Sequence, residues 1–408
     1  MSSYDQHNIE DTNIWLIGSD IDHKVKYNSA ATEPAWNNGD IGTHPGLKVW
    51  RIENFHVVSW PKSLYGQFYD GDSFIVLHSY IIPTKDHELG SSQQKLGHDI
   101  FFWLGSKTTQ DEAGTAAYKT VELDEFLHGV ATQHRETQLH PSEEFLSLFP
   151  RLSIRTGGVR SGFHHVDTQQ HPANITTLLR VFKHPSPTLA EHGHSIVVHE
   201  VEPIWQSLDD ADVFVLEKDG KIWVWQGKDC SPMEKAKAAQ VVNDLTLAKH
   251  MDVEVLSQTE ARSRVVVDLL GGRGIDQFSF HSSRPIHAVT HHTSDDRTTP
   301  RPRRLLRVLN DGLGDQVRFE LDKEGDTIQI SDLDSNDIFI FDTGKKIWVW
   351  EGLQAARAKR DAWKFSTGSY LRYLQQHSRT PEIIATTPIA KVVEGNENAA
   401  FFKAISLY

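Results

Sequence analysis

Short hydrophobic runs recur three times along the chain in the same order. Each copy has an opening strand-like run, a second run led by Asp and a third run that ends in Trp and Gly, followed by a helical segment and a short apolar segment. The opening runs are 47–52, 178–182 and 305–309, the Asp-led runs are 72–77, 212–216 and 337–341, the Trp-Gly runs are 101–105, 222–227 and 347–352, and the final segments are 145–149, 265–270 and 400–405. Three apolar strands followed by an amphipathic helix predict a sheet covered by helices. A period of about 120 residues is the size of a domain, too long for a solenoid repeat.

The repeat predicts three tandem domains with two further segments. The predicted divisions are an N-terminal extension at 1–45, domain 1 at 46–166, domain 2 at 167–271, a linker at 272–303 and domain 3 at 304–408. The linker contains Ser, His, Thr, Arg and Pro with little periodicity. The Gly-rich join at 157–165 has fixed apolar positions, so we expect an ordered connection there.

The helical run of the first copy, 110–127, has two distinct sides. On a helix of about 100° per residue, one side carries Ala113, Ala116, Ala117, Thr120, Leu123 and Leu127, and the other carries Thr115, Tyr118, Lys119, Glu122 and Phe126. The second side has two aromatics among charges, and a rod of roughly 27 Å of this kind can lie in a partner's cleft. An ordinary surface helix with two singly exposed aromatics fits the same pattern.

Asp124 lies on the apolar side of this helix, just before the helix stop at His128 and Gly129. A carboxylate at the edge of an apolar stripe costs free energy unless a cation or a donor meets it. A cation held by Asp124 and by carbonyls of the following turn is one solution. An aspartate that points sideways into water is the other.

Composition indicates a folded, acidic protein. The 408 residues are 38% hydrophobic and include 11 Trp and 19 Phe, which can fill several cores. The net charge of −13 argues against a general binder of nucleic acid or anionic membranes. The single Cys230 cannot form an internal disulfide, and we see neither a signal peptide nor a run long enough to span a membrane. We therefore expect a cytoplasmic protein.

Carboxylates at repeated positions predict metal sites. Asp is a poor strand former, yet Asp72, Asp212 and Asp337 each open the second run of a copy. Seven residues after the Gly of the Trp-Gly run stand Glu112 and Glu234 in the first two copies, where the third has Lys359. An Asp, a Glu and nearby carbonyls form an all-oxygen site, which suits calcium better than zinc or copper. In the third copy we expect the Lys359 ammonium to stand opposite Asp337 in place of a metal.

Patterns typical of enzymes are not found in the sequence. Cys230 has no flanking signature, Gly-x-Ser-x-Gly and P-loop motifs do not occur, and the 23 His lack zinc-site spacing on a helix. We therefore expect a protein that is not an enzyme.

Several segments of the first copy resemble the gelsolin/villin family. They are Gly-Leu-Lys-Val-Trp-Arg-Ile-Glu-Asn-Phe at 46–55, Leu-Tyr-Gly-Gln-Phe-Tyr-Asp-Gly-Asp-Ser-Phe at 64–74, Gln-Asp-Glu-Ala-Gly-Thr-Ala-Ala at 110–117, Gln-His-Arg-Glu at 133–136 and Gly-Gly-Val-x-Ser-Gly-Phe-x-His at 157–165. With three copies instead of six, the chain is most similar to the short severin and fragmin type. The resemblance implies an α+β fold of three tandem gelsolin-like domains, each with a mixed, roughly five-stranded sheet between a long and a short helix.

The resemblance also implies a function and its residues. It implies a calcium-regulated protein of the actin cytoskeleton that severs filaments and caps their barbed ends, with calcium as its cofactor. The first copy's calcium site would use Asp72 and Glu112 with the carbonyls of Gly71 and Val159, and a site shared with actin would use Asp124 with the carbonyls of Gly129 and Ala131; the second copy's site would use Asp212, Glu234, the Ala211 carbonyl and Asp276. The helix 110–127 would enter the cleft at actin's barbed end, through Gln110, Thr115, Tyr118, Lys119, Glu122 and Phe126.

Two alternatives remain, and one family property is in doubt. The rival function is a calcium-insensitive capping or scaffold protein that binds actin without severing it; a secretory-coat component is disfavoured by the intact first-copy motifs. The family's basic phosphoinositide clusters fall at 151–155 and 181–187, which carry few positive charges here, so lipid regulation is left open. We expect a monomer that binds actin monomers and filaments.

Overall fold

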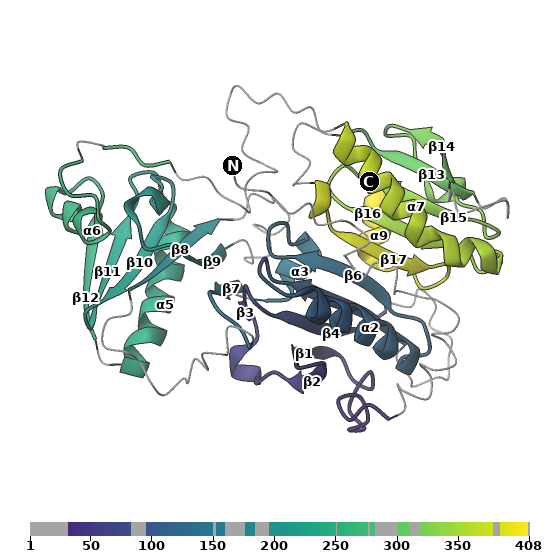
Figure 1. Cartoon of the computed structure of the whole chain (residues 1–408), viewed down its shortest axis with the longest axis horizontal. Helices are drawn as coiled ribbons and strands as arrows, with labels where there is room; N and C mark the ends of the chain where they lie inside the picture. Colours follow the sequence, from purple (N-terminus) through teal and green to yellow (C-terminus); the bar gives the residue numbers. More distant parts are fainter. Residues whose placement is uncertain are drawn as a thin grey trace, which may run out of the picture. The chain divides into compact units, whose positions relative to one another are not determined.

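The computed structural model describes residues 32–82, 95–149, 152–159, 176–183, 196–249, 251–275, 278–281, 301–309, 318–377 and 384–406. They divide into two compact units. Unit 1 takes in the described parts of Met1–Ser63, Asp72–Phe145 and His292–Tyr408, and unit 2 those of Leu64–Gly71 and Leu146–His291. Unit 1 therefore contains most of the first copy and the third copy, and unit 2 contains the second copy with two short stretches of the first (Figure 1).

The first copy has five strands in unit 1 and two helices. The strands are β1 (Gly46–Glu53), β2 (His56–Ser59), β4 (Ser73–Ile81), β5 (Leu96–Leu104) and β6 (Thr132–Thr137), and the helices are α2 (Gln110–Phe126) and α3 (Glu143–Ser147). Their order in the sheet is β2-β1-β4-β5-β6, antiparallel except for the parallel pair β5 and β6. The long helix begins where the sequence predicts, because the side chain of Thr109 caps it by accepting a hydrogen bond from the backbone N–H of Glu112.

The third copy repeats this plan and joins the first. Its strands are β13 (Arg304–Leu309), β14 (Arg318–Glu324), β15 (Ile338–Asp342), β16 (Ile347–Glu351) and β17 (Ile389–Val393), with helices α7 (Arg357–Gln376) and α9 (Ala399–Ile405). The last strands of the two copies, β17 and β6, pair antiparallel, with Ile389 opposite Arg135 and Lys391 opposite Gln133. The two copies thus share one ten-stranded sheet.

Unit 2 holds the second copy with two added strands. Its strands β8 (Thr177–Lys183), β9 (Ile196–Val201), β10 (Val213–Lys218), β11 (Lys221–Gln226) and β12 (Asp252–Ser257) are extended by β7 (Leu152–Arg155) and β3 (Gln67–Tyr69), and its helices are α5 (Pro232–Lys249) and α6 (Arg264–Leu269). The order is β12-β11-β10-β8-β9-β7-β3, so β12 forms one edge of this sheet. Short 3-10 turns lie at Lys62–Leu64, Trp205–Ser207, Ala261–Ser263 and Ile330–Asp332.

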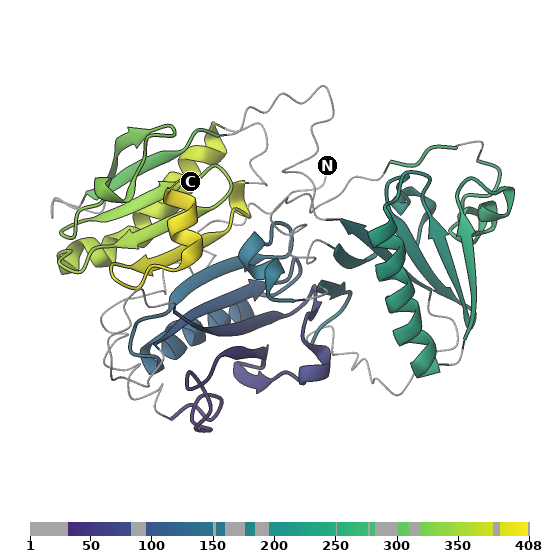
Figure 2. The same cartoon turned by 180° about the vertical axis from the view of Figure 1, so that it is seen from behind.

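In each copy the long helix and the short helix bury opposite faces of the sheet. In the second copy, Ala238 and Val241 of α5 pack on one face, whereas Val266 and Val267 of α6 pack on the other. In the third copy, Phe401 and Ile405 of α9 cover the face opposite α7, as Figure 2 shows for the yellow C-terminal helix. The predicted α+β fold, with five strands between a long and a short helix in each copy, is confirmed.

Two core residues lie in segments that the sequence pattern placed outside the domains. Trp36, in the predicted extension 1–45, is completely buried and packs edge-on against Trp50 at 5.1 Å between ring centroids. Phe280, in the predicted linker 272–303, is buried against Trp225 at 5.7 Å, and its backbone N–H donates to Asp210. Both segments therefore contribute to the neighbouring core. The rest of the linker at 276–277 and 282–300, and the join from 160 to 165, lie outside the described residues.

Candidate functional site

The three copies place their strand-start aspartates in the same backbone setting. The glycine that ends each Trp-Gly run donates its N–H to the aspartate's carbonyl, from Gly105 to Asp72 at 3.0 Å, from Gly227 to Asp212 at 2.9 Å and from Gly352 to Asp337 at 3.0 Å. A Cβ at Gly227 or Gly352 would lie 2.2 Å from a backbone oxygen, so only glycine fits there. The contact brings the start of the long helix to the aspartate, which is why a Glu in its first turn and the Asp belong to one site.

In the first copy, two buried carboxylates occupy this site. Asp72 is 0% exposed and Glu112 is 3% exposed. The Thr108 hydroxyl donates to Glu112 at 3.4 Å, and Nη1 of Arg51 reaches Asp72 at 3.5 Å. A cation or hydrogen-bond donors stabilise a carboxylate in a buried position. This donor set of oxygens fits calcium.

The two backbone carbonyls predicted to complete the first site belong to unit 2. The Gly71 N–H donates to the carbonyl of Gly157 at 2.8 Å, and a Cβ at Gly71 would lie 2.6 Å from that carbonyl oxygen. Glycine is therefore required at position 71. Val159 lies at the end of the described segment 152–159. The contribution of the Gly71 and Val159 carbonyls to a calcium site stays a prediction.

In the second copy, both carboxylates already have close partners. The Arg180 Nε donates to Asp212 at 2.6 Å, and the two Glu234 carboxylate oxygens accept backbone N–H groups from Ser231 and Lys183, each at 2.7 Å. Ser231 and Glu234 also form the reciprocal contact of a capping box, since the Glu234 N–H donates to the Ser231 hydroxyl at 3.3 Å. The Ala211 N–H donates to Asp209 at 3.0 Å. The last predicted ligand, Asp276, lies outside the described residues.

In the third copy, two cations hold the aspartate. The Lys359 ammonium donates to one oxygen of Asp337, and Nη1 of Arg307 donates to the other at 2.7 Å. Asp337 is buried, so this neutralisation matters for its stability. The ammonium thus stands opposite Asp337 as expected, and the exclusion of a divalent cation from this position stays a prediction.

The turn after α2 gathers Asp124, Gly129 and Ala131. The Ala131 N–H donates to Asp124 at 2.9 Å, the Gln133 side-chain amide donates to the other carboxylate oxygen at 2.7 Å, and the Gly129 N–H donates to the Asp124 carbonyl at 2.8 Å. His128 and Gly129 have φ of 67° and 71°, the left-handed geometry that ends a helix. Burial raises the pKa of Asp124 to about 6, against the lowering effect of the two donors and of the Lys391 charge. The sequence-predicted aspartate therefore points into the turn.

The predicted outer face of α2 is only partly an outer face. Glu122 is 0% exposed, which corrects its placement among exposed residues. The reason is Lys119, whose ammonium donates both to Glu122 at 2.8 Å and to Glu33 at 2.6 Å, so the segment before β1 covers this part of the helix. Gln110 is exposed, while Thr115, Tyr118 and Phe126 are half-buried. These four remain candidates for contact with a partner.

Among the described residues there is no group of three or more His, Cys, Asp or Glu side chains placed to hold a metal ion. The predicted sites need only two carboxylates each, with carbonyls as the remaining ligands. No helix within the described ranges is long and apolar enough to cross a membrane.

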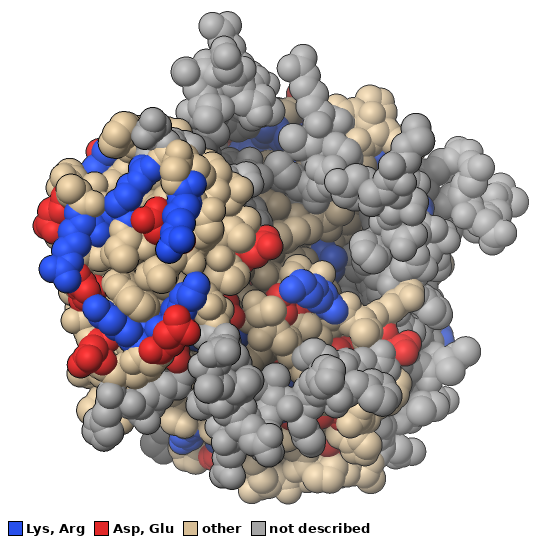
Figure 3. All heavy atoms as spheres, turned by 60° about the vertical axis from the view of Figure 1, so that its left-hand side comes forward, with Lys and Arg blue, Asp and Glu red and all other residues tan. Residues whose placement is uncertain are grey.

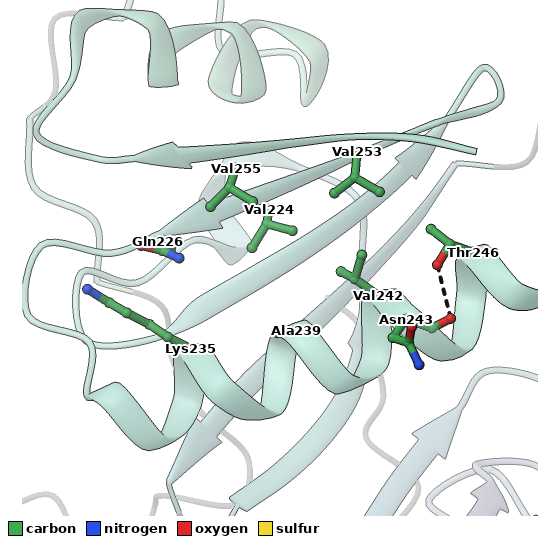
Figure 4. Close-up of a pocket in the computed structure, with 9 residues that line it drawn as sticks. All are labelled: Val224, Gln226, Lys235, Ala239, Val242, Asn243, Thr246, Val253 and Val255. Carbon is green, nitrogen blue, oxygen red and sulfur yellow. Dashed lines mark hydrogen bonds between the residues drawn. The ribbon is translucent and has the colours of Figure 1, made fainter. Parts of the chain in front are cut away.

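Unit 2 carries an apolar groove beside its long helix. The groove has a volume of about 300 Å³ and runs between α5 and the strands β11 and β12, of which β12 is the edge strand (Figure 4). Its lining is mainly aliphatic, from Val224, Ala239, Val242, Val253 and Val255, with Gln226, Lys235, Asn243 and Thr246 around them. Among the residues coloured in Figure 3, Lys and Arg side chains are interspersed with Asp and Glu around an uncharged area.

Sequence reasoning missed three arginines that the structure places at the aspartates, Arg51, Arg180 and Arg307. The signal that could have found them is their shared place in the opening strand, in Trp-Arg-Ile of the first copy and Leu-Arg-Val of the other two.

Comparisons with known proteins agree on one repeat. A family model described as Gelsolin repeat matches residues 54–146, 194–266 and 323–402. Gelsolin-like protein 1 of Lumbricus terrestris is 35% identical over 353 residues, covering 85% of each chain, and Gelsolin-like protein 2 of the same animal is 33% identical over 97% of this chain and 96% of its own. Gelsolin of Drosophila melanogaster is 35% identical over 89% of this chain, which spans 42% of that longer protein.

Proposed function

The chain belongs to the gelsolin family, and we propose that it is a cytoplasmic protein that binds actin, severs filaments and caps their barbed ends in response to calcium. The observation that carries this proposal is the position of the β6–β17 joint. The turn that holds Asp124 leads directly into β6, and β6 is the strand to which the third copy attaches. A change at that turn and a release of the third copy are therefore mechanically coupled. No catalytic step is part of the proposal.

Polar contacts beside the strand pairing hold the first and third copies together. The buried Lys346 of the third copy donates to His134 at 3.1 Å and lies 3.2 Å from Glu144. Asn398 donates to Asp99 at 2.7 Å, and the Thr137 hydroxyl donates to the Thr386 carbonyl at 3.1 Å. Buried apolar side chains of both copies also form one continuous core cluster, which includes Ala131 of the first copy and Ile389 of the third. We interpret this closed arrangement, held by strand pairing, polar contacts and apolar packing, as the inactive state.

The carboxylates fit a calcium response that opens this joint. Asp72 and Glu112 would hold one ion in the first copy, Asp212 and Glu234 one in the second, and Asp124 one shared with actin. When bound, calcium supplies positive charge at these carboxylates. Such charge beside Asp124 would repel Lys391, which lies opposite Gln133 across the joint. A ligand at about 100 times its dissociation constant shifts an equilibrium by roughly 2.7 kcal/mol per site, enough for two sites to open a modest contact between domains.

The long helix of the first copy is the proposed actin-docking element. The half-buried side chains of Tyr118 and Phe126 on α2 supply aromatic anchors of the kind that dominate interfaces. The second copy would bind the filament side. Severing then uses the binding free energy of both copies against a contact between actin subunits.

The second candidate is a capping or scaffold protein that binds actin without a calcium response. The pairing of Asp212 with Arg180 and of Asp337 with Lys359 favours it, because carboxylates that already have a cation partner respond weakly to a metal. The two functions differ in one assay. Pyrene-labelled filaments diluted below the critical concentration should depolymerise in a burst only with calcium if the protein severs, whereas slowed loss of subunits with and without calcium supports the second candidate.

A matched pair of variants of the full chain tests the site. Asp124→Asn should weaken calcium-dependent binding of actin monomers, because it removes the carboxylate charge in the turn after α2. Glu125→Gln removes the same charge one residue further along the same helix and should leave that binding unchanged. Equal behaviour of the two variants contradicts the assignment of Asp124.

A further inference from the structure

The opening strand of each copy places an arginine beside the strand-start aspartate in one conserved register within the chain. Arg51 pairs with Phe74, Arg180 with Phe214 and Arg307 with Phe339, and each phenylalanine stands two residues after the aspartate of its copy. The guanidinium also lies over an aromatic ring, 5.7 Å from the Phe214 centroid in the second copy and 5.1 Å from that of Phe339 in the third. The repeated geometry makes the arginine a built part of each site.

The contact between the opening-strand arginine and its aspartate is longer in the first copy than in the other two. In the first copy, Arg51 reaches Asp72 only at 3.5 Å, and its Nε donates to Glu53 at 2.7 Å instead. In the second copy, Arg180 is 3% exposed, and its Nε and Nη2 lie 2.6 Å and 2.5 Å from the same oxygen of Asp212.

The third copy adds a second cation to the same aspartate. There, Arg307 and Lys359 each hold one oxygen of Asp337. Both oxygens of the carboxylate are thereby committed to side chains of the protein.

A cation that is already paired with a buried carboxylate opposes the binding of another cation there. A metal must either displace the guanidinium or share the carboxylate with it, and the lost or weakened charge-assisted hydrogen bonds reduce the affinity for the metal. We propose that the first-strand arginine is a resident counter-ion that competes with calcium, so that the first copy fills at the lowest calcium concentration, the second fills later and the third does not fill. The inference rests on the proposed calcium response and assigns the residue that sets its order.

Calorimetric titration of the full chain with calcium tests the order. Asp212→Asn identifies the second-copy site as the binding event that disappears. In Arg180→Gln, that event should move to calcium concentrations at least about tenfold lower, because a charge-assisted pair is lost. Arg51→Gln is the matched control and should move the first-copy event less than about twofold, since its pair with Asp72 is long.

Removal of Arg180 also leaves Asp212 buried without its guanidinium, so thermal unfolding with calcium and with chelator provides a second measurement. In chelator, Arg180→Gln should unfold at a lower temperature than the wild type, and calcium should raise its unfolding temperature by more than it raises that of the wild type. Arg180→Lys keeps the charge without the fork of two nitrogens, so its unfolding temperature in chelator should lie between those of Arg180→Gln and the wild type.

The possible results distinguish the calcium site of the second copy from the competition by Arg180. If Asp212→Asn removes one calcium while Arg180→Gln binds calcium no more tightly than the wild type, the arginine does not compete and this inference is overturned, although the calcium site stands. If Asp212→Asn removes none, the second-copy site itself is wrong and both fail.

Discussion

Replacing Lys346 by methionine should lower the calcium concentration needed for severing. Lys346 belongs to the third copy, but its ammonium contacts His134 and Glu144 of the first, and it is 8% exposed. Methionine keeps the length and apolar body of the side chain and removes the charge. In the open state the lysine would be solvated beside Trp348, over which it lies at 4.6 Å. The substitution therefore destabilises the closed state more than the open state.

The size of the effect follows from these contacts. Burial alone would raise the pKa of Glu144, but the nearby charge of Lys346 holds it at about 2. Loss of one partly exposed, charge-assisted contact costs about 2 kcal/mol, which is roughly a 30-fold change in the ratio of closed to open molecules. When two calcium ions bind only the open state, the midpoint varies as the square root of that ratio, so it should fall roughly fivefold.

The assay is the depolymerisation of diluted pyrene-labelled filaments at graded free calcium. Lys345→Met, at the exposed neighbouring position, makes the same chemical change away from the joint and should leave the midpoint in place. An unchanged or higher midpoint for Lys346→Met, in a protein that folds normally, would refute the closed-state role of the joint.

Three further predictions address other parts of the chain. Lys359→Glu should add one weakly bound calcium per chain in calorimetry, because it restores the carboxylate that the first two copies have; no added calcium would contradict the substitution of ammonium for metal. Tyr118→Ala should weaken binding of actin monomers by about tenfold, measured by fluorescence titration; an unchanged affinity, with circular dichroism showing an intact helix, would remove α2 as the docking element. Burial, aided by the charge of Arg180, lowers the pKa of His199 to about 4, so between about pH 6.5 and pH 4 the unfolded state binds a proton at His199 and the folded state does not. The free energy of unfolding of unit 2 should therefore be highest above about pH 6.5 and should fall by about 1–2 kcal/mol by pH 5. In urea unfolding His199→Leu should reduce this fall, whereas the exposed His281→Leu should not; equal curves for the two variants would assign the pH dependence elsewhere.

Strands with buried apolar side chains could be predicted because their sequence carries the signal. All five residues of β15 are buried, and its Asp-led apolar run marks it plainly. The start of α2 could also be predicted from the sequence, since Thr109 is a good N-cap and Glu112 stands three residues later. The sequence indicates that Asp124 needs a partner because it is a carboxylate on an apolar side, and the structure supplies the donors Ala131 and Gln133, while its role as a metal ligand stays a prediction.

Other elements depend on partners that a single sequence does not display. Glu122 was assigned to an exposed side because a helical projection contains neither Glu33 nor the bond that Lys119 makes to both. Phe280 lies in a stretch without periodicity, and only the packing on Trp225 shows that it belongs to a core. Only the strand register shows that the arginine of each opening strand lies beside the aspartate of its copy.

The strand β6 combines a polar sequence, Thr-Gln-His-Arg-Glu-Thr, with complete burial at the joint with β17. An uncovered sheet edge can pair with a strand of another chain, and charged side chains are the usual protection against this pairing. In the proposed opening, the third copy would leave this edge uncovered, and the edge carries side chains that water solvates well. The edge would then resist pairing with a second copy of the chain each time the joint opens and closes.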